Sequence, residues 1–151
     1  MKLLLRLAYR VLQLRWFLTR PVTLGVRLLP IRGDTVLLVR HSYQNAWFLP
    51  GGGVKRGETL EQAIRREAAE ECGAQLEHLE ILGAFTHFYE YKNDHIILFL
   101  SRDFRLAGKP DYEIEKVDFF PFDQLPEDIS QGSRRRIEEY KRGALPAHGT
   151  W

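Results

Sequence analysis

A chain of 151 residues with 44% hydrophobic and 28% charged side chains suits one soluble, compact domain and excludes an intrinsically disordered protein. The formal net charge is +2, and residues 1–20 carry five basic and no acidic side chains, so the remainder holds 17 basic and 20 acidic residues. This nearly neutral body argues against nucleic-acid binding as the main activity, because nucleic-acid-binding proteins usually present a dominant basic face.

The only cysteine, Cys72, excludes an intramolecular disulfide and indicates a reducing compartment. It has no histidine partner in the nearby sequence, so we predict a small packing residue and not a nucleophile. The N-terminus shows neither a signal-peptide cleavage site nor an uninterrupted apolar stretch of the ~20 residues that span a bilayer. We therefore expect a cytoplasmic protein.

The first predicted element is a helix, because residues 2–18 contain neither glycine nor proline. Its apolar residues recur at spacings of four and three: Leu3, Leu7, Val11, Leu14 and Leu18. Lys2, Arg6 and Arg10 share a polar arc only about 80° wide. So much apolar surface favours burial against protein, and we expect residues 1–20 to form a basic amphipathic helix that mediates a homodimer. Packing on its own domain and contact with an anionic membrane surface are the alternatives.

The main domain is predicted over residues 21–143. Val22–Ile31 and Thr35–Arg40 are apolar, β-branched runs that predict a hairpin around the turn Arg32-Gly33-Asp34. Trp47–Leu49 is a short predicted strand that runs into a proline and three glycines.

A central helix is predicted over Thr59–Cys72, with Gly73 as its C-terminal cap. The later elements are two strands around the turn Lys92-Asn93-Asp94, a loop, a strand and a helix: Leu79–Tyr91, Ile96–Phe104, Gly108–Asp111, Val117–Phe122 and Ser133–Arg142. Residues 144–151 are expected to form a loose tail. Strands on both sides of a central helix predict an α/β domain with a mixed sheet flanked by helices.

The central helix carries the pattern that points to chemistry. At about 100° per residue, Glu67, Glu70 and Glu71 fall in the same arc as the apolar residues that begin the helix. Carboxylates crowded on an inward face repel one another unless a proton or a cation intervenes. Three oxygen ligands on one turn suit a hard ion such as Mg²⁺ or Mn²⁺. The alternative is a solvated acidic face with Arg65 and Arg66 as surface partners.

The spacing of the stretch from Gly52 to Ala74 decides between these alternatives. Its fixed positions are Gly52-x5-Glu58-x7-Arg66-Glu67-Ala68-x-Glu70-Glu71-x-Gly73-Ala74. This pattern resembles the Nudix box, with alanine at both positions where the family usually has a bulkier aliphatic residue. The segments Trp47–Pro50 and Phe119–Pro126 also resemble the family's sequence around the box. The resemblance implies an α/β/α sandwich and a diphosphatase that hydrolyses a nucleoside diphosphate linked to another moiety.

The resemblance also implies a role for each box residue. A divalent cation, Mg²⁺ or Mn²⁺, would be bound by Glu67, Glu70, Glu71 and the carbonyl group of Gly52. Glu58 and Arg66 would form an ion pair that locks the preceding loop to the helix. The attacking water would be oriented or deprotonated by a box glutamate, Glu70 or Glu71, or by a carboxylate of a later loop. For the later carboxylate the sequence offers Glu113 and Glu115, whose alternative role is that of exposed loop charges.

Four residues of the strand after the box are candidates for binding the nucleobase of a substrate: Phe85, His87, Tyr89 and Tyr91. Alternation places all four on one face, where they either stack on a base or fill the core. Tyr91 stands near the position of a tyrosine in some dinucleoside-polyphosphate hydrolases of the family. However, Pro50 replaces the glutamine that those enzymes and RNA 5′-end hydrolases usually carry before the paired glycines. Phe88 and Tyr89 stand where many ADP-ribose hydrolases have a proline.

The partner expected from the resemblance is therefore a small nucleotide and not a nucleic acid. The candidates are nucleotide sugars or ADP-ribose, dinucleoside polyphosphates and noncanonical nucleoside triphosphates. A non-catalytic ligand sensor on the same fold is the alternative from another class, and it is disfavoured because such a protein would be expected to lose box glutamates. A scaffold or membrane-surface protein led by residues 1–20 is compatible with enzymatic activity.

Overall fold

Strands are the main regular element of the structure, a computed structural model that describes residues 11, 13–15, 17–89 and 91–151. The strands and helices are, in chain order, β1 (Val22–Arg32), β2 (Thr35–His41), β3 (Trp47–Phe48), α2 (Leu60–Cys72), β4 (Ala74–Leu76), β5 (Glu80–Tyr89), β6 (Lys92–Ser101), β7 (Phe104–Leu106), β8 (Ile114–Pro121), α3 (Gln131–Lys141) and β9 (Ala147–Thr150). Among these described residues, seven strands form the main sheet and β4 pairs with β7 in a separate ribbon.

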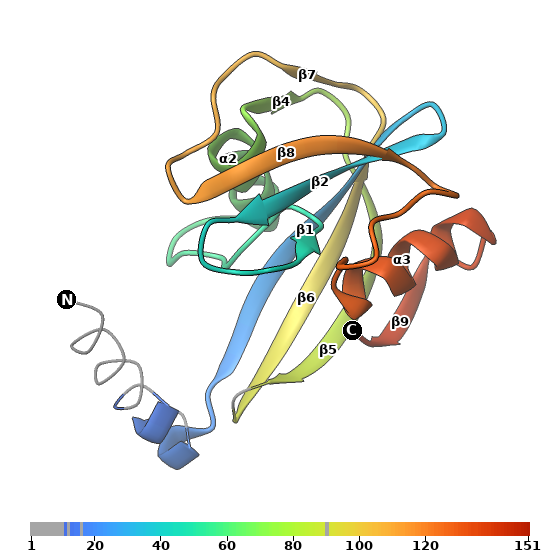
Figure 1. Cartoon of the computed structure of the whole chain (residues 1–151). Helices are drawn as coiled ribbons and strands as arrows, with labels where there is room; N and C mark the ends of the chain where they lie inside the picture. Colours follow the sequence, from blue (N-terminus) through green and yellow to red (C-terminus); the bar gives the residue numbers. More distant parts are fainter. Residues whose placement is uncertain (1–10, 12, 16, 90) are drawn as a thin grey trace.

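The main sheet splays open between β1 and β2. The two strands pair as an antiparallel hairpin only beside the turn at Gly33, through two residue pairs. Beyond it, β1 runs parallel to β6 while β2 runs antiparallel to β8 (Figure 1). The loop after β3 lies along β1 instead, since the N–H groups of Leu28 and Val26 donate to the carbonyls of Pro50 and Gly52. The predicted turn is therefore confirmed, and the opening beyond it receives the glycine-rich loop that leads into α2.

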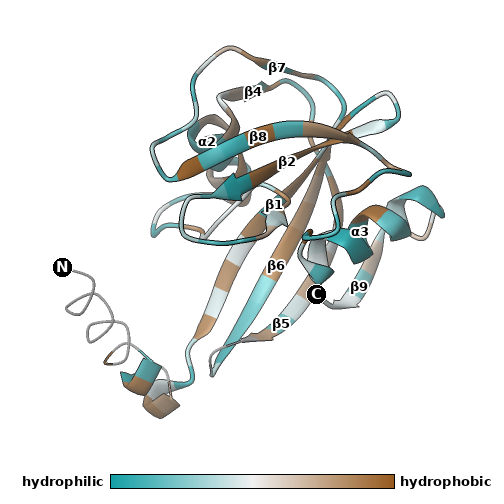
Figure 2. Ribbon diagram, in the orientation of Figure 1, coloured by the Kyte–Doolittle hydropathy of each residue, from teal (hydrophilic) through white to brown (hydrophobic). Residues whose placement is uncertain are grey.

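The core consists of two apolar clusters on opposite faces of the sheet. Residues of β1 alternate between them, with Val26 and Leu28 in the cluster that contains Ile64 of α2. Leu29 belongs to the cluster that contains Ile137 of α3. Figure 2 shows hydrophobic residues along β2 and the middle of β6, the strands that lie between these layers. This arrangement confirms the expected three-layer α/β/α architecture with a mixed sheet.

The ribbon of β4 and β7 was not expected from the sequence, because each of its strands has only three residues. It closes the α2 side of the core, where Leu76 and Phe104 pack with Cys72. Cys72 is 3% exposed, and burial raises the pKa of its thiol above the ordinary value. Cys72 is thus the packing residue that the sequence predicts.

The predicted turn at Lys92-Asn93-Asp94 is wrong, because these residues begin β6. Asn93 pairs with Phe88 of β5 on one side and with Val22 of β1 on the other, so strand partners satisfy its polar backbone. The turn instead includes Tyr91, whose φ of 65° is left-handed.

The expectation of a loose tail at residues 144–151 is also wrong. Ala147–Thr150 form β9, which adds to the edge of β5 in parallel (Figure 1). Trp151 continues this pairing, since its N–H donates to the carbonyl of Thr86 at 2.9 Å. The short run with Gly149 carries no hydrophobic periodicity, and an open strand edge supplies its hydrogen-bond partners.

The expected helix over residues 2–18 lies mainly outside the described residues. Where the structure describes this segment, at residues 11, 13–15 and 17–19, the backbone is helical. The Phe17 ring meets Tyr91 edge-on at a centroid distance of 5.2 Å, next to the β5–β6 turn. Within the described part of the chain, no helix has the length and apolar character needed to cross a membrane.

Candidate active site

The helix α2 begins and ends as the sequence predicts. The Thr59 hydroxyl accepts a hydrogen bond from the Gln62 N–H, and the Gln62 side chain accepts one from the Thr59 N–H. Gly73 has a φ of 64° at the other end, a left-handed conformation that glycine adopts without strain. The two caps fix the helix register and therefore the direction of its three carboxylates.

Arg66 connects the preceding loop to two of those carboxylates. Its Nε and Nη2 donate to the Glu58 carboxylate at 2.6 and 3.0 Å, and Nη2 also donates to the carbonyl of Gly53 at 3.0 Å. Its Nη1 donates to Glu67 at 2.6 Å and to Glu70 at 3.0 Å. The proposed lock between Glu58 and Arg66 thus has the expected geometry, and the same guanidinium holds two of the expected metal ligands.

The ion pair shifts the acidity of both partners. Hydrogen bonds from Arg66 and from the Lys55 N–H lower the pKa of Glu58 to about 2. The Glu58 hydrogen bond in turn raises the pKa of Arg66 above its ordinary value. Both groups are therefore charged at neutral pH.

Glu71 is fixed from two other directions. Its Oε1 lies 2.9 Å from Nε2 of His41, the last residue of β2, and its Oε2 accepts the N–H of Gly51 at 2.8 Å. The carbonyl of Gly51 accepts a hydrogen bond from Arg27 of β1. The glycine-rich loop therefore lies between the carboxylates of α2 and a basic side chain on the sheet.

Glu67 lies directly against Gly52. A side chain at Gly52 would place its Cβ only 2.6 Å from Oε1 of Glu67, so any larger residue there would push the Glu67 carboxylate aside. Glu67 is 9% exposed, and burial raises its pKa, with Arg66 opposing the shift and Glu71 and Glu70 adding to it. The three carboxylates are thus close enough to influence one another, as the helical projection predicts.

The side chains of Glu67, Glu70 and Glu71 offer only carboxylate oxygens, the type of ligand atom that a hard divalent cation prefers. Within the part of the chain that the structure describes, no three acidic, histidine or cysteine side chains converge as a ready metal site. The reason is visible in the contacts, because Arg66 holds Glu67 and Glu70 while His41 and the Gly51 N–H hold Glu71. The Gly52 carbonyl accepts the N–H of Val26.

The two candidates for a later-loop carboxylate differ in their surroundings. Glu115 lies 3.5 Å from Arg40, which also pairs with Asp128 at 3.0 Å. Glu113 is exposed, its carboxylate accepts a hydrogen bond from the Tyr112 hydroxyl at 3.3 Å, and its carbonyl accepts the N–H of Ser42 at 2.9 Å. Glu113 thus lies beside the residue that follows His41, whereas Glu115 is paired with Arg40.

The four candidate base-binding residues do not form one surface. Phe85 is 3% exposed and belongs to the core on the α3 side, so its assignment to a base-binding site is wrong. Tyr91 lies in the turn beyond β5 and is exposed. The side chain of Tyr89 lies outside the described residues. His87 lines a cavity, and burial lowers its pKa, which favours the neutral imidazole.

This cavity has a volume of about 420 Å³ and lies on the α3 face of the sheet. It is lined by residues of the sheet, the 44–48 segment and α3, including Arg27, Phe48, His87, Asp94, Ser130 and Trp151. A smaller cavity of about 240 Å³ shares Arg27, Asp94 and Ile96 with it and reaches Gly52 and Gly53. Together the two lead from the glycine-rich loop toward Trp151.

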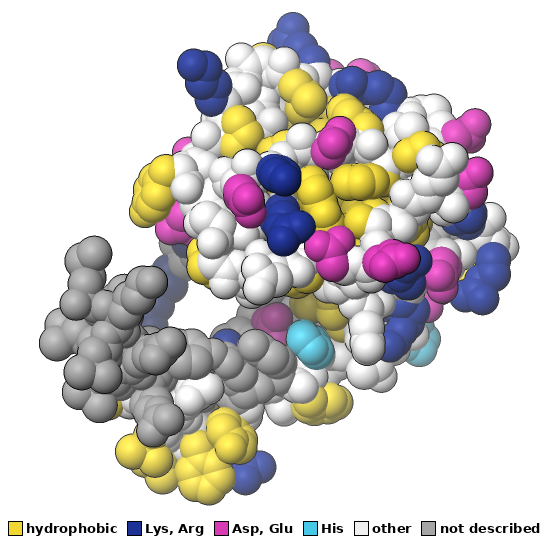
Figure 3. Space-filling model, viewed as in Figure 1, with side chains coloured by type: hydrophobic (Ala, Val, Ile, Leu, Met, Phe, Trp, Pro, Cys, Tyr) yellow, Lys and Arg dark blue, Asp and Glu magenta, His cyan; other side chains and the backbone are white. Residues whose placement is uncertain are grey.

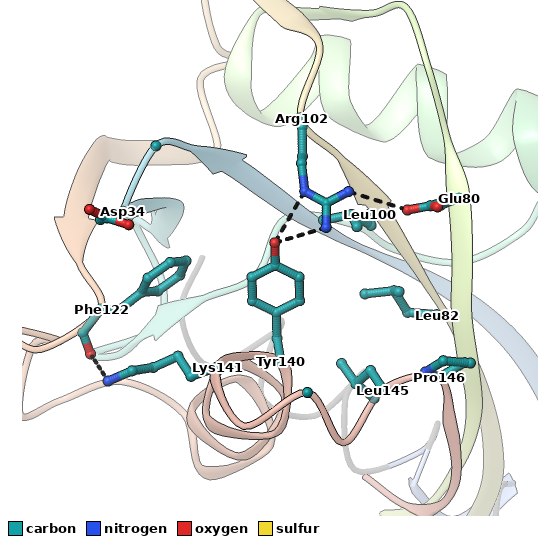
Figure 4. Close-up of a pocket in the computed structure, with 12 residues that line it drawn as sticks. Asp34, Glu80, Leu82, Leu100, Arg102, Phe122, Tyr140, Lys141, Leu145 and Pro146 are labelled. Carbon is teal, nitrogen blue, oxygen red and sulfur yellow. Dashed lines mark hydrogen bonds and ion pairs between the residues drawn. The ribbon is translucent and has the colours of Figure 1, made fainter.

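Another cavity, of about 690 Å³, contains none of the box residues. Figure 4 shows Arg102 in this cavity, where it donates to the Tyr140 hydroxyl and pairs with Glu80. Lys141 donates to the carbonyl of Phe122. The smaller cavity of about 240 Å³, in contrast, is lined by Gly52 and Gly53 of the box.

Sequence reasoning missed three residues of this region: His41, Arg27 and Trp151. His41 ends a strand and Arg27 sits inside one, so neither belongs to a recognisable motif. Trp151 lies in the segment expected to be loose. Only the pairing of distant strands brings these residues beside the box.

Comparison with known proteins gives a consistent result. The model of the NUDIX domain family matches residues 20–140, most of the chain. A curated RNA pyrophosphohydrolase of Psychromonas ingrahamii is 44% identical over 57 residues, which are 38% of this chain and 32% of that relative. The match therefore spans about a third of the relative's length.

Solved structures show the same fold. The MutT NUDIX hydrolase of Burkholderia pseudomallei has a TM-score of 0.70 and 26% identity, with 78% of this chain and 96% of that chain covered. The MutT protein of Methanosarcina mazei has a TM-score of 0.72 and 24% identity, with coverages of 83% and 97%. At this identity the second likeness concerns the fold alone.

Proposed function

The chain belongs to the Nudix family, and from this premise we propose that it hydrolyses a phosphoanhydride bond in a nucleoside diphosphate linked to another moiety, with Mg²⁺ or Mn²⁺ as cofactor. The observation that carries the proposal is the clustering of three carboxylates on α2. Glu67 and Glu70 share one nitrogen of Arg66, and Glu71 contacts the loop of Gly51. Stabilising the fold does not by itself require three acidic side chains on this face of α2.

We assign Glu67, Glu70 and Glu71 as the metal ligands, with the Gly52 carbonyl as a further candidate. A divalent cation bound there would supply charge neutralisation at the phosphate oxygens and lower the pKa of an attacking water. Arg66 would release Glu67 and Glu70 while keeping Glu58, whose two hydrogen bonds hold the guanidinium independently. The Glu58 contact would thus keep the loop and the helix in register throughout the reaction.

The chain offers three groups to orient or deprotonate the water: Glu70, Glu71 and Glu113. Glu71 accepts hydrogen bonds on both oxygens, which favours a positioning and ligand role. Glu70 is partly exposed and Glu113 is exposed, so both carboxylates are accessible to water. Glu115 is a weaker candidate because Arg40 neutralises it.

We propose a small nucleotide as substrate, with its phosphates at the glycine-rich loop and its nucleoside in the cavity of about 420 Å³. Arg27 is common to both cavities and contributes positive charge between them. On the face of the molecule shown in Figure 3, acidic and basic side chains are intermixed and no basic patch is visible. A formal net charge of only +2 favours a small nucleotide over a long nucleic acid.

An RNA 5′ end is a second candidate, because the curated relative named above is an RNA pyrophosphohydrolase and is 44% identical over the matched segment. Pro50 argues against it, since the family's RNA 5′-end hydrolases usually have glutamine there. A short 5′-triphosphorylated RNA therefore belongs in the substrate screen beside ADP-ribose, a nucleotide sugar, a dinucleoside polyphosphate and a noncanonical nucleoside triphosphate.

The experiment is this screen with Mg²⁺ or Mn²⁺, with both products identified, on the wild-type protein and on Glu70→Gln. Loss of one partly exposed charge should leave the fold intact and lower turnover by about 100-fold or more, as removal of one transition-state contact does. Glu61→Gln is the matched control, because Glu61 lies on the same helix and its carboxylate accepts hydrogen bonds from Arg65, away from the three box carboxylates. Near-wild-type turnover in folded Glu70→Gln would refute the assignment, and nucleotide binding without turnover would favour the sensor.

A further inference from the structure

We infer that Trp151 is the stacking platform for the substrate's nucleobase, so that the C-terminal segment and not β5 determines preference for base-containing ligands. The inference rests on the proposed function, because it assigns the nucleoside half of the same substrate. Trp151 thereby takes the base-stacking role that the sequence suggested for Phe85, which is buried in the core.

Trp151 is held rigidly enough to serve this purpose. Its N–H donates to the Thr86 carbonyl at 2.9 Å, and its carbonyl accepts Nη1 of Arg135 at 3.2 Å. The preceding carbonyl, of Thr150, accepts Nη1 of Arg136 at 3.1 Å. The backbone of this segment is thus bonded to β5 on one side and to α3 on the other.

The indole ring is fixed by a second set of contacts. It meets the Phe85 ring edge-on at a centroid distance of 6.0 Å, and the Arg136 guanidinium lies 5.6 Å from its centroid. Gly132 of α3 faces the Nε1 edge, and a Cβ at Gly132 would overlap the indole. Packing therefore defines the ring position, which keeps the entropy cost of ligand binding low.

The ring also has the right surroundings for a base. Trp151 is half-buried and lines the cavity of about 420 Å³, whose other wall includes Phe48. Gln44 and Gln131 also line the cavity, and a glutamine amide can donate to and accept from the edge of a base. Arg27 links the cavity to the loop of Gly51. A nucleoside stacked on Trp151 would thus direct its phosphates toward the box.

The first test measures binding without turnover. ADP, GDP, CDP and UDP are titrated into Glu70→Gln protein while tryptophan fluorescence is followed, with inorganic diphosphate as the probe that lacks a base. At least one nucleoside diphosphate should quench fluorescence at concentrations where diphosphate does not. The quenching should vanish when Trp151→Phe is added to Glu70→Gln. Failure of all four nucleotides to quench, or quenching that persists in the double variant, would overturn the inference.

The second test separates stacking from packing. Trp151→Leu keeps apolar bulk but loses the aromatic face, whereas Trp151→Phe keeps a smaller ring. Loss of one base–aromatic stack should raise KM for a base-containing substrate by about 10- to 100-fold in Trp151→Leu, and by less in Trp151→Phe, with kcat nearly unchanged. Phe88→Ala is the matched control, because Phe88 is 70% exposed on β5 and lies outside the cavity. An unchanged KM in folded Trp151→Leu would refute the inference.

Gly132→Ala provides an independent check that leaves Trp151 in place. Alanine favours a helix over glycine, but here its methyl group would displace the indole. KM should therefore rise as in Trp151→Leu while the protein stays folded. The inference and the proposed function fail separately: unchanged KM values with active enzyme overturn only the stacking role, whereas full activity of Glu70→Gln overturns only the metal-site assignment.

Discussion

His41 Nε2 lies 2.9 Å from Oε1 of Glu71, and the two side chains are only 9% and 12% exposed. The contact joins the last residue of β2 to the fourth turn of α2, across the opening where β1 and β2 separate. A hydrogen bond to a carboxylate in such a protected place orients the oxygen that a cation would use.

Replacement of His41 should therefore weaken metal binding without removing a ligand. His41→Ala should raise the Mg²⁺ concentration needed for half-maximal activity by about 10- to 100-fold, the usual effect of losing a group that orients a ligand. His41→Gln is the matched variant, because its amide N–H can replace the Nε2 donor. A metal titration that is identical in wild type and His41→Ala would show that the contact is only structural.

The ion pair of Glu58 and Arg66 should make stability depend on pH. Hydrogen bonds from Arg66 hold the pKa of Glu58 at about 2, below its usual 4.5. The contribution of this carboxylate is therefore complete above pH 4.5 and is lost as the pH falls toward 2. Glu58→Gln should lower Tm at pH 7, and its difference from wild type should shrink between pH 4.5 and 3.

Glu61→Gln serves as the control for that measurement. This substitution also removes one negative charge near the start of α2. The pair that it breaks, between Glu61 and Arg65, is an exposed i,i+4 ion pair worth only about 0.3–0.5 kcal/mol. A Glu58→Gln difference that stays constant from pH 7 to 3 would contradict the assigned acidity of Glu58.

Hydrolysis in ¹⁸O-labelled water tests which bond is cleaved. A site built from carboxylates and a cation activates water for attack on phosphorus, so the label should appear in a phosphate-containing product. Simple monophosphate esters should be poor substrates because they lack the anhydride. Mass spectrometry of both products locates the label, and its recovery in a non-phosphorylated product would refute attack on phosphorus.

The local elements of this fold could be read from the sequence, since their signals are short-range. Thr59 and Gly73 cap α2 as predicted, and the turn at Gly33 is where it was expected. The errors concern long-range pairing. Asp94 looked like a turn residue, yet pairing with β1 and β5 places it in β6. Residues 147–150 have no apolar periodicity, and the free edge of β5 makes them a strand.

The candidate site likewise contains residues that a local motif predicts and residues that only long-range strand pairing brings together. The box residues share one loop and one helix, so the resemblance to the Nudix box could predict the contact of Arg66 with Glu58. His41 and Trp151 come from other parts of the chain, and no local pattern marks them. Phe85 shows the limit of alternation, because the face it shares with His87 is core at one end and cavity at the other.

The N-terminal segment carries apolar surface that the domain does not cover. The described residues Val11, Leu14 and Leu18 are all more than half exposed. The nearby ends of the sheet add Val22, which is 70% exposed, beside the contact of Phe17 with the β5–β6 turn. Several exposed apolar side chains in this part of the molecule favour a protein partner over solvent. A second copy of the chain is the simplest partner that presents a matching surface.

We therefore expect residues 1–20 to mediate a homodimer. Deletion of residues 1–18 should convert a dimer at micromolar concentration into a monomer, measured by light scattering coupled to size-exclusion chromatography. Leu14→Glu is the matched variant, because one buried charge at an apolar interface should weaken the dimer while the rest of the segment remains. Activity per chain should survive both changes, since no box residue lies in the segment.

A full-length protein that is monomeric at these concentrations would refute the dimer. Salt-sensitive binding of the full chain to anionic liposomes, lost on deletion, would assign the segment to a membrane surface.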